Sequence, residues 1–248
     1  MSKAILYDST LCIGCKACEA ACAERWGLPY DEKIAAEEKI SAHKLTAIET
    51  HGDRFCRRLC MNCMEPACAS VCPVGALQKT ALGPVTYDSD KCMGCRYCMQ
   101  ACPFQVPTYE WNKRLPRMRK CDMCFERQSK GKLTACAEAC PVGATVNGDR
   151  EELLAEARKR LAEKPNEYYQ KIYGLKEVGG TSVFFLSAVP FAQIGLRTGV
   201  PQEPLPETTW RVLELLPDVV STGAVLLGGI WWITNRRADV ARVEGKRK

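Results

Sequence analysis

The chain has 248 residues, of which 17 are cysteine and only two are histidine. Its apolar share of 46% and charged share of 26% are typical of a folded protein, so a disordered chain is excluded. A chain of this length with an odd number of cysteines does not fit a small disulfide scaffold. His43 and His51 lie in no recognisable motif, so catalysis by histidine is also unsupported. The cysteines are therefore the candidates for function.

The first predicted element is a short strand at residues 5–9, which leads directly into a cysteine-rich loop. A similar stretch at residues 85–89 precedes a second loop of this kind, at a constant offset of 80 residues. Residues 67–76 and 135–144 also resemble each other, and each contains two cysteines followed by Pro-Val-Gly-Ala. The chain is therefore interpreted as an internal duplication that forms two ferredoxin-like modules.

Sixteen cysteines fall into four groups of four, and Cys56 is left over. The groups are Cys12, Cys15, Cys18 and Cys22; Cys60, Cys63, Cys68 and Cys72; Cys92, Cys95, Cys98 and Cys102; and Cys121, Cys124, Cys136 and Cys140. The first and third groups have the spacing C-x2-C-x2-C-x3-C, which ferredoxins use for [4Fe–4S] clusters. In such a run three cysteines hold one cluster and the fourth ligates its neighbour. The sequence thus predicts four clusters, although spacing alone allows either a nested or a sequential pairing of the groups.

Structural zinc is the alternative, because zinc also binds four thiolates. Zinc ribbons place two cysteine pairs far apart, however, and do not close a triplet with C-x3-C-P. Cys56 is expected to be a buried apolar residue rather than a ligand. Basic residues crowd the cysteine loops, where they either raise cluster potentials or lie at a solvated or partner-docking surface. These residues are Arg57, Arg58, Arg96, Arg114, Arg117, Arg119 and Lys120.

The four-group pattern resembles the iron–sulfur (beta) subunit of membrane-bound oxidoreductases of the formate dehydrogenase, hydrogenase and dimethyl sulfoxide reductase type. The resemblance implies the nested pairing and an α+β fold of duplicated dicluster modules. Some members replace a cysteine of the third group with tryptophan, whereas this chain has Cys95 there, so four [4Fe–4S] clusters are expected. The implied ligand sets are Cys12, Cys15, Cys18 and Cys140 (cluster 1); Cys22, Cys121, Cys124 and Cys136 (cluster 2); Cys60, Cys63, Cys68 and Cys102 (cluster 3); and Cys72, Cys92, Cys95 and Cys98 (cluster 4).

Residues 1–148 are expected to hold the two modules, and residues 149–190 to close this body. Within the second range, an amphipathic helix is predicted from Asp149 to Lys164, with Leu153, Leu154, Ala157 and Leu161 on one face. A buried strand is predicted within residues 179–187. Residues 191–211, which lie in a proline-rich stretch, are expected to form an extended linker.

A transmembrane helix is predicted at residues 212–234, of which residues 219–234 carry no charge. Glycines and the pair Trp231 and Trp232 suit a span of this kind, although a buried core helix and a surface-lying helix remain alternatives. Residues 235–248 form a basic tail with six basic and two acidic residues, so most of the net charge of +6 lies there. No basic patch is interleaved with aromatic residues, and nucleic-acid binding is not expected.

The positive-inside rule places the basic tail in the cytoplasm and the cluster-bearing body in the periplasm. The N-terminus shows no signal peptide, and the resemblance implies export together with a catalytic partner that carries a twin-arginine signal. The expected function is non-catalytic electron transfer between a catalytic subunit and an integral membrane cytochrome b or quinone-reactive subunit. A molybdenum or tungsten formate dehydrogenase is the first candidate for the catalytic partner. The alternatives are a nickel–iron hydrogenase partner, or a free-standing polyferredoxin.

Overall fold

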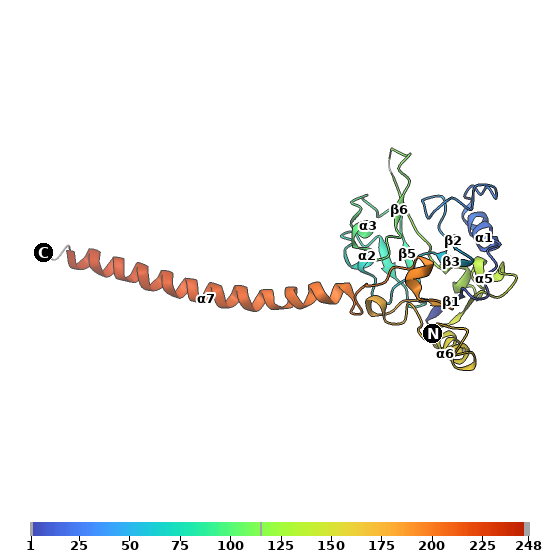
Figure 1. Cartoon of the computed structure of the whole chain (residues 1–248). Helices are drawn as coiled ribbons and strands as arrows, with labels where there is room; N and C mark the ends of the chain where they lie inside the picture. The colour runs from blue at the N-terminus through green and yellow to red at the C-terminus, as the bar shows by residue number, and fades with distance from the viewer. Residues whose placement is uncertain (1, 115, 246–248) are drawn as a thin grey trace. The chain divides into compact units, whose positions relative to one another are not determined.

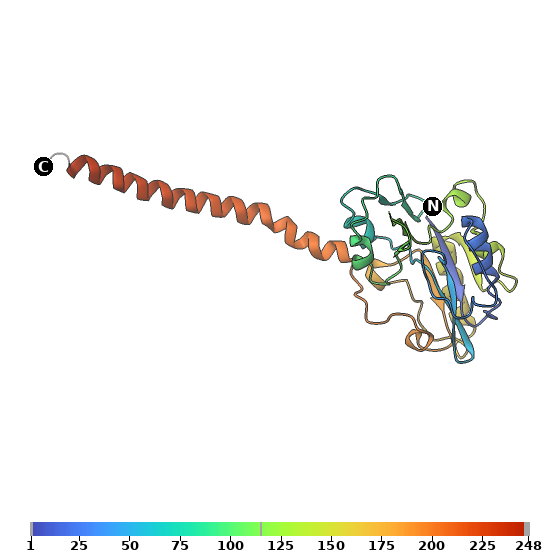
Figure 2. The same cartoon turned by 90° about the horizontal axis from the view of Figure 1, so that it is seen from above.

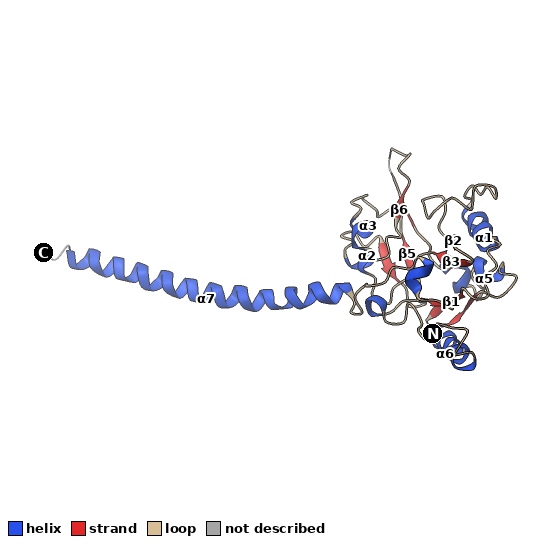
Figure 3. Ribbon diagram, in the orientation of Figure 1, coloured by secondary structure: helices blue, strands red, loops and turns tan. Residues whose placement is uncertain are grey.

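The computed structural model describes residues 2–114 and 116–245 (Figure 1). It divides into two compact units, Met1–Pro206, here called the body, and Glu207–Lys248. Three basic residues that were expected in the cytoplasmic tail, Lys246, Arg247 and Lys248, lie outside the described residues. Helices, strands and long connecting loops are mixed throughout the body (Figure 3). The fold is therefore α+β, with one long apolar helix at its C-terminal end.

The centre of the body is a three-stranded sheet whose order is β8–β1–β9. Strand β1 (Lys3–Asp8) pairs antiparallel with β8 (Thr145–Asp149) and parallel with β9 (Val183–Leu186). In Figure 2 the blue β1 runs beside the orange β9. Ala4 and Leu6 pack with helix α6, while Ile5 and Tyr7 pack in the core that contains several cysteines. Residues 4–7 of the strand are therefore apolar, as expected where both faces are covered.

Helix α6 (Arg150–Glu163) covers one face of this sheet, and its existence confirms the predicted amphipathic helix. Leu153, Leu154 and Ala157 are buried, and Leu161 packs against them. Asp149 occupies the N-cap position, but its side chain makes no capping hydrogen bond. Its carboxylate instead accepts a hydrogen bond of 3.0 Å from the Lys3 ammonium, which ties the helix start to β1.

Three two-stranded hairpins and five short helices carry the remainder of the cysteine-containing region. The hairpins are β2 (Ala47–His51) with β3 (Arg54–Arg58), β4 (Leu77–Lys79) with β5 (Val85–Tyr87), and β6 (Thr108–Tyr109) with β7 (Met118–Arg119). The helices are α1 (Ala17–Trp26), α2 (Ala67–Ser70), α3 (Tyr97–Ala101), α4 (Phe125–Ser129) and α5 (Ala135–Glu138). Strands β1 and β5 lead into the first and third cysteine groups, as the duplicated sequence predicts.

The segment after β9 differs from the extended linker that the sequence predicts. Strand β9 itself, preceded by the 3₁₀ turn η1 (Glu177–Gly179), confirms the predicted buried strand. A second 3₁₀ turn, η2 (Phe191–Ile194), then packs Phe191, Ile194 and Leu196 into the main core. Apolar side chains spaced along a proline-rich stretch therefore hold it against the body.

Helix α7 (Leu205–Gly245) follows and begins before residue 212, the predicted start of the transmembrane segment. It contains Pro217, and none of its residues is buried. By length and composition it could cross a membrane, and the mean hydropathy of its most apolar stretch is 1.5.

Candidate metal centres

All 17 cysteines are described, and all are free thiols rather than disulfides. Cys56 lies in β3 and is completely buried, as expected for a small apolar residue. The 16 grouped cysteines lie in the short helices or in the loops that precede and follow them. The body is therefore rich in unpaired, largely buried sulfur.

Two pairs of helices bring the cysteine groups together. Helix α1, which carries Cys18 and Cys22, packs against α5, which carries Cys136 and is followed by Cys140. Helix α2, which carries Cys68, packs against α3 of the third group. The first group thus lies beside the fourth and the second beside the third, which is the arrangement of the nested pairing.

One pocket collects a complete predicted ligand set. Cys60, Cys63, Cys68 and Cys102 all line it, although they come from two different groups. The other lining residues are Met61, Asn62, Pro66, Ala67, Val85, Pro103, Phe104, Val106, Pro107 and Lys120. An apolar cavity with four convergent thiols has the chemical character that a buried iron–sulfur cluster requires.

The pKa shifts of Cys22 and Cys98 also indicate which cysteines lie close to one another. Burial, together with the charges of Cys136 and Cys124, raises the pKa of Cys22 to about 12. Burial also raises the pKa of Cys98, to which Cys92, Cys95 and Cys72 add. Thiols that repel one another's ionised forms in this way lie close together. The first set contains three of the four cysteines predicted for one cluster, and the second contains all four predicted for another.

The backbone of the loops is shaped to present N–H groups to the sulfurs. Left-handed φ angles occur at Gly14 and Lys16 in the first group, and at Gly94 and Arg96 at the equivalent positions of the third. In the second and fourth groups, backbone amides donate to sulfur: Ala76 to Cys72 at 3.2 Å, Met123 to Cys121 at 3.3 Å, and Ala135 to Cys124 at 3.5 Å. Amides aimed inward from such turns form concavities that favour anionic groups, including iron–sulfur clusters.

The donor set therefore fits [4Fe–4S] clusters. Among the described residues, no group of three or more His, Cys, Asp or Glu side chains could hold a metal ion. A cubane cluster needs a wider arrangement, because each of its four thiolates binds a different iron atom. Sulfur-only donors, inward amides and an apolar shell are features that such a cluster uses.

The basic residues around the loops divide into two kinds. Arg57 and Lys120 are buried, with exposed fractions of 1% and 6%. Five others are at least partly exposed: Arg58, Arg96, Arg114, Arg117 and Arg119. Of these, Arg119 pairs with Glu110 at 3.2 Å, and Arg96 lies over the ring of Trp111. Only the two buried residues have the placement expected of charges that act on the metal centres.

Tyrosine hydroxyls near the thiols form a feature that the sequence interpretation missed. Tyr109 lies 3.3 Å from the sulfur of Cys98. Tyr87 hydrogen-bonds Cys92, whereas Tyr7, which lies beside Cys12, donates its hydroxyl hydrogen to the carbonyl of Phe55 at 2.9 Å. Tyr7 and Tyr87 occupy equivalent positions of the duplicated strands. This repetition in the sequence could have indicated that both tyrosines lie near the cysteines.

Comparison with known proteins agrees with this geometry. A family profile described as a 4Fe-4S dicluster domain matches residues 53–150. The hydrogenase-2 operon protein HybA of Shigella flexneri is 37% identical over 275 residues, which cover 91% of this chain and 84% of the relative. The formate dehydrogenase iron–sulfur subunit of Haemophilus influenzae is 34% identical over 248 residues, with 91% and 76% covered. This chain belongs to their family, the 4Fe–4S subunits of formate dehydrogenase- and hydrogenase-type oxidoreductases.

A further member, the nitrate-inducible formate dehydrogenase iron–sulfur subunit of Escherichia coli, is 35% identical over 221 residues, which cover 82% of this chain and 74% of the relative. The matches extend well beyond the dicluster profile, which begins after the first cysteine group. Family membership therefore rests on most of the chain, and it identifies the protein as an electron-transfer iron–sulfur subunit.

Proposed function

We propose that this subunit carries electrons through four [4Fe–4S] clusters between a catalytic subunit and a membrane-embedded quinone-reactive or cytochrome b partner. Such clusters, each held by four thiolates, supply one-electron transfer. The observation that supports the proposal best is the convergence of Cys60, Cys63, Cys68 and Cys102 on one pocket. The proposed ligand sets are the four that the resemblance implies.

The exposure of the cysteines supports a chain of centres with two accessible ends. Cys15 and Cys95, which belong to the proposed clusters 1 and 4, are the two exposed members of the 16. Cys60 and Cys121 belong to clusters 3 and 2, are both buried, and lie close enough for Cys60 to raise the pKa of Cys121. The two modules thus meet through their inner centres, while an outer centre of each is open to a partner.

Iron analysis tests the number of clusters. The full chain, purified anaerobically, should contain roughly 16 iron and 16 sulfide per chain, four of each for every cluster. The variant Cys63→Ala should lose the iron of one cluster, about four atoms per chain. A value near eight, or stoichiometric zinc without iron, would contradict the proposal.

The catalytic partner is proposed to be a molybdenum or tungsten formate dehydrogenase, with a nickel–iron hydrogenase as the second candidate. Relatives named for the two systems match the same 91% share of this chain. Affinity purification of the tagged chain from detergent extracts, followed by identification of the large co-purifying polypeptide, distinguishes them. Recovery of the chain alone, without any large partner, would favour a free-standing polyferredoxin.

We propose that α7 anchors the subunit in a membrane, with the body in the periplasm and the basic C-terminus in the cytoplasm. The apolar, uncovered helix supports the anchor, and the positive-inside rule supports the orientation. Truncation after Pro206 should move the protein from the detergent-extracted to the aqueous fraction. Protease added to intact spheroplasts should digest the body, and protection until lysis would refute the orientation.

A further inference from the structure

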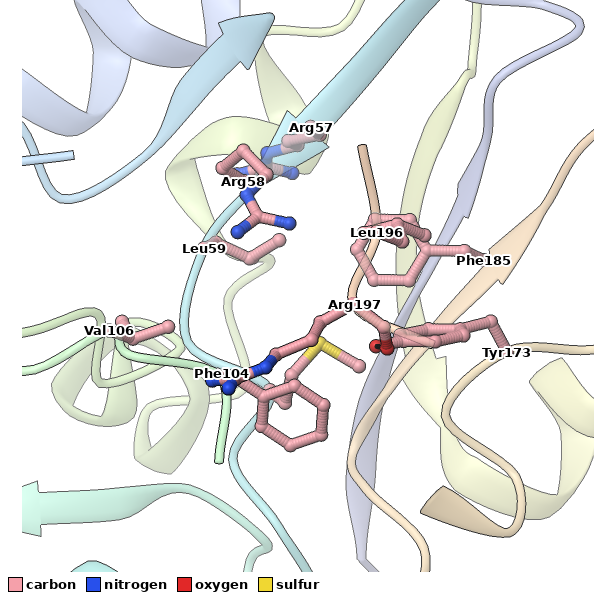
Figure 4. A pocket seen from close by; sticks show the side chains of 10 residues that line it. Arg57, Arg58, Leu59, Phe104, Val106, Tyr173, Phe185, Leu196 and Arg197 are labelled. Atoms are coloured by element: carbon pink, nitrogen blue, oxygen red, sulfur yellow. Dashed lines mark hydrogen bonds between the residues drawn. The ribbon is translucent and has the colours of Figure 1, made fainter. Parts of the chain in front are cut away.

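Arg57 is the largest fully buried side chain of the body. It lies on strand β3, where successive side chains point to opposite faces. Its neighbour Arg58 reaches the other way, and its guanidinium donates to the carbonyl of Gly195 at 2.9 Å. Figure 4 shows both arginines among the residues that line a pocket, together with Leu59 and Phe104.

The hydrogen-bond partners of Arg57 outside the cysteines are neutral. Its Nε donates to the hydroxyl of Thr46 at 3.0 Å, and its Nη1 donates to the hydroxyl of Thr145 at 3.2 Å. Within residues 2–114 and 116–245, no carboxylate lies within ion-pair distance of the guanidinium. Burying a charge without a counter-charge is strongly unfavourable. The fold must therefore supply negative charge to Arg57 from another source.

That source is the sulfur of the cysteine loops. The guanidinium lies close enough to Cys136, Cys18 and Cys121 to interact electrostatically with all three. A protonated thiol is neutral and cannot balance a guanidinium, whereas thiolates bound to iron can.

The second nearby arginine is already neutralised. Arg25 lies beside Cys124 of the same predicted set, but its Nη2 is 3.1 Å from a carboxylate oxygen of Asp122. Among the described residues, Arg57 therefore lacks a carboxylate partner, as does buried Lys120, whose ammonium donates to the carbonyl of Cys121 at 3.2 Å. One-electron reduction adds a negative charge to the thiolate-bound centre, and a fixed cation nearby stabilises the reduced form.

We propose that Arg57 is the counter-charge of the centre held by Cys22, Cys121, Cys124 and Cys136, and that it raises the reduction potential of that centre. The proposal rests on the function proposed above. Arg57 is a tuning residue rather than a ligand, since its guanidinium is a donor without an acceptor. The same cation lies near Cys18 as well, so a smaller effect is expected on the neighbouring centre.

A redox titration of the full chain, followed by EPR, tests the proposal. Arg57→Gln removes the charge but keeps a polar side chain, Arg57→Lys keeps the charge, and Arg58→Gln is the matched control from the other face. For Arg57→Gln, the midpoint of one component should fall so that the oxidised-to-reduced ratio at fixed potential rises at least tenfold, about 59 mV for a one-electron couple. Arg57→Lys should recover most of this shift, and Arg58→Gln should produce none.

Iron content separates the possible failures. If the wild-type chain itself lacks about 16 iron atoms, the proposed function fails, whatever the arginine variants do. If Arg57→Gln keeps its iron and its midpoints, Arg57 does not tune the centre and the inference is overturned. Loss of iron in both Arg57→Gln and Arg57→Lys would assign Arg57 to folding alone and would also overturn it. Loss of iron in Arg57→Gln but not in Arg57→Lys would support the proposal that the centre needs a positive charge at this position.

Discussion

The hydroxyl oxygen of Tyr109 lies 3.3 Å from the sulfur of Cys98. A second hydroxyl, that of Tyr87, hydrogen-bonds Cys92 of the same group. The oxygen of Tyr87 accepts the backbone N–H of Met118 at 3.3 Å, which leaves its own hydrogen free for the sulfur. Two tyrosines thus direct donors to the cysteines proposed for cluster 4. Donors of this kind stabilise the more negative, reduced form of a thiolate-bound centre.

Replacement of Tyr109 by phenylalanine should therefore lower the midpoint potential of one centre. The change removes one hydrogen bond of about 1 kcal/mol, which corresponds to roughly 40 mV in a one-electron couple. EPR-monitored titration of the full chain measures it. Tyr97→Phe is the control, because Tyr97 lies on α3 of the same group but is 59% exposed. Equal shifts in both variants would show that hydrogen bonding to Cys98 is not the cause.

Gly14 and Gly94 occupy equivalent positions in the duplicated loops, yet alanine should affect them unequally. Both have φ angles in the left-handed region, +71° and +75°, so each substitution costs on the order of 1 kcal/mol in backbone strain. At Gly14 the added methyl group would also overlap the ring of Phe55, whereas nothing lies within 4 Å at Gly94. Gly14→Ala should lower the apparent melting temperature more than Gly94→Ala. An equal or reversed order would contradict the packing of Phe55 on the first loop.

Cys56 should be dispensable for iron binding. It is completely buried in β3, and its truncation to alanine removes one buried atom at a cost of about 1 kcal/mol. We expect Cys56→Ala to retain the full iron content with a slightly lower melting temperature. Cys60→Ala, in contrast, should lose one cluster's share of iron. Loss of iron in the Cys56→Ala variant would indicate instead that Cys56 is a cluster ligand.

Replacement of Ile194 should destabilise the fold, although this residue lies in the proline-rich stretch that was predicted to be an extended linker. Its side chain is 1% exposed and packs in the main core, so truncation to alanine should cost about 2–5 kcal/mol. Gln193→Ala changes the exposed neighbour in the same 3₁₀ turn and should be nearly neutral. Thermal unfolding of the two variants, monitored by far-UV circular dichroism, measures the contrast. Similar melting temperatures would place this segment outside the folded core.

Sequence alone predicted the features that repeat or that have a local period. The cysteine spacing and the 80-residue offset indicated two modules, and both strands that lead into the repeated loops are present. The helix at Arg150–Glu163 followed from its apolar face, and the strand at Val183–Leu186 from its uniform apolar run. These patterns involve residues that are close in sequence or that repeat, so they can be recognised without knowledge of the fold.

Features that depend on distant partners were not predictable in the same way. The hairpin of β2 and β3 was missed, although the Gly52-Asp53 turn between two strand-like runs was a usable signal. The burial of Phe191 was missed because prolines on either side suggested an extended chain. Arg57 could not be separated from the exposed basic residues, since sequence gives charge but not the face on which a strand side chain lies. Only tertiary packing makes that distinction.

The central position of β1 has a consequence for biosynthesis. Its two neighbours in the sheet, β8 and β9, both follow it by more than 130 residues, so β1 has no partner until Asp149 is made and lacks its second partner until the chain has grown past Leu186. The β4–β5 hairpin, by contrast, joins residues within Leu77–Tyr87 and can close early. The two modules are therefore expected to mature at different times, with the one that contains both chain ends of the body sealed only after translation of nearly all of it.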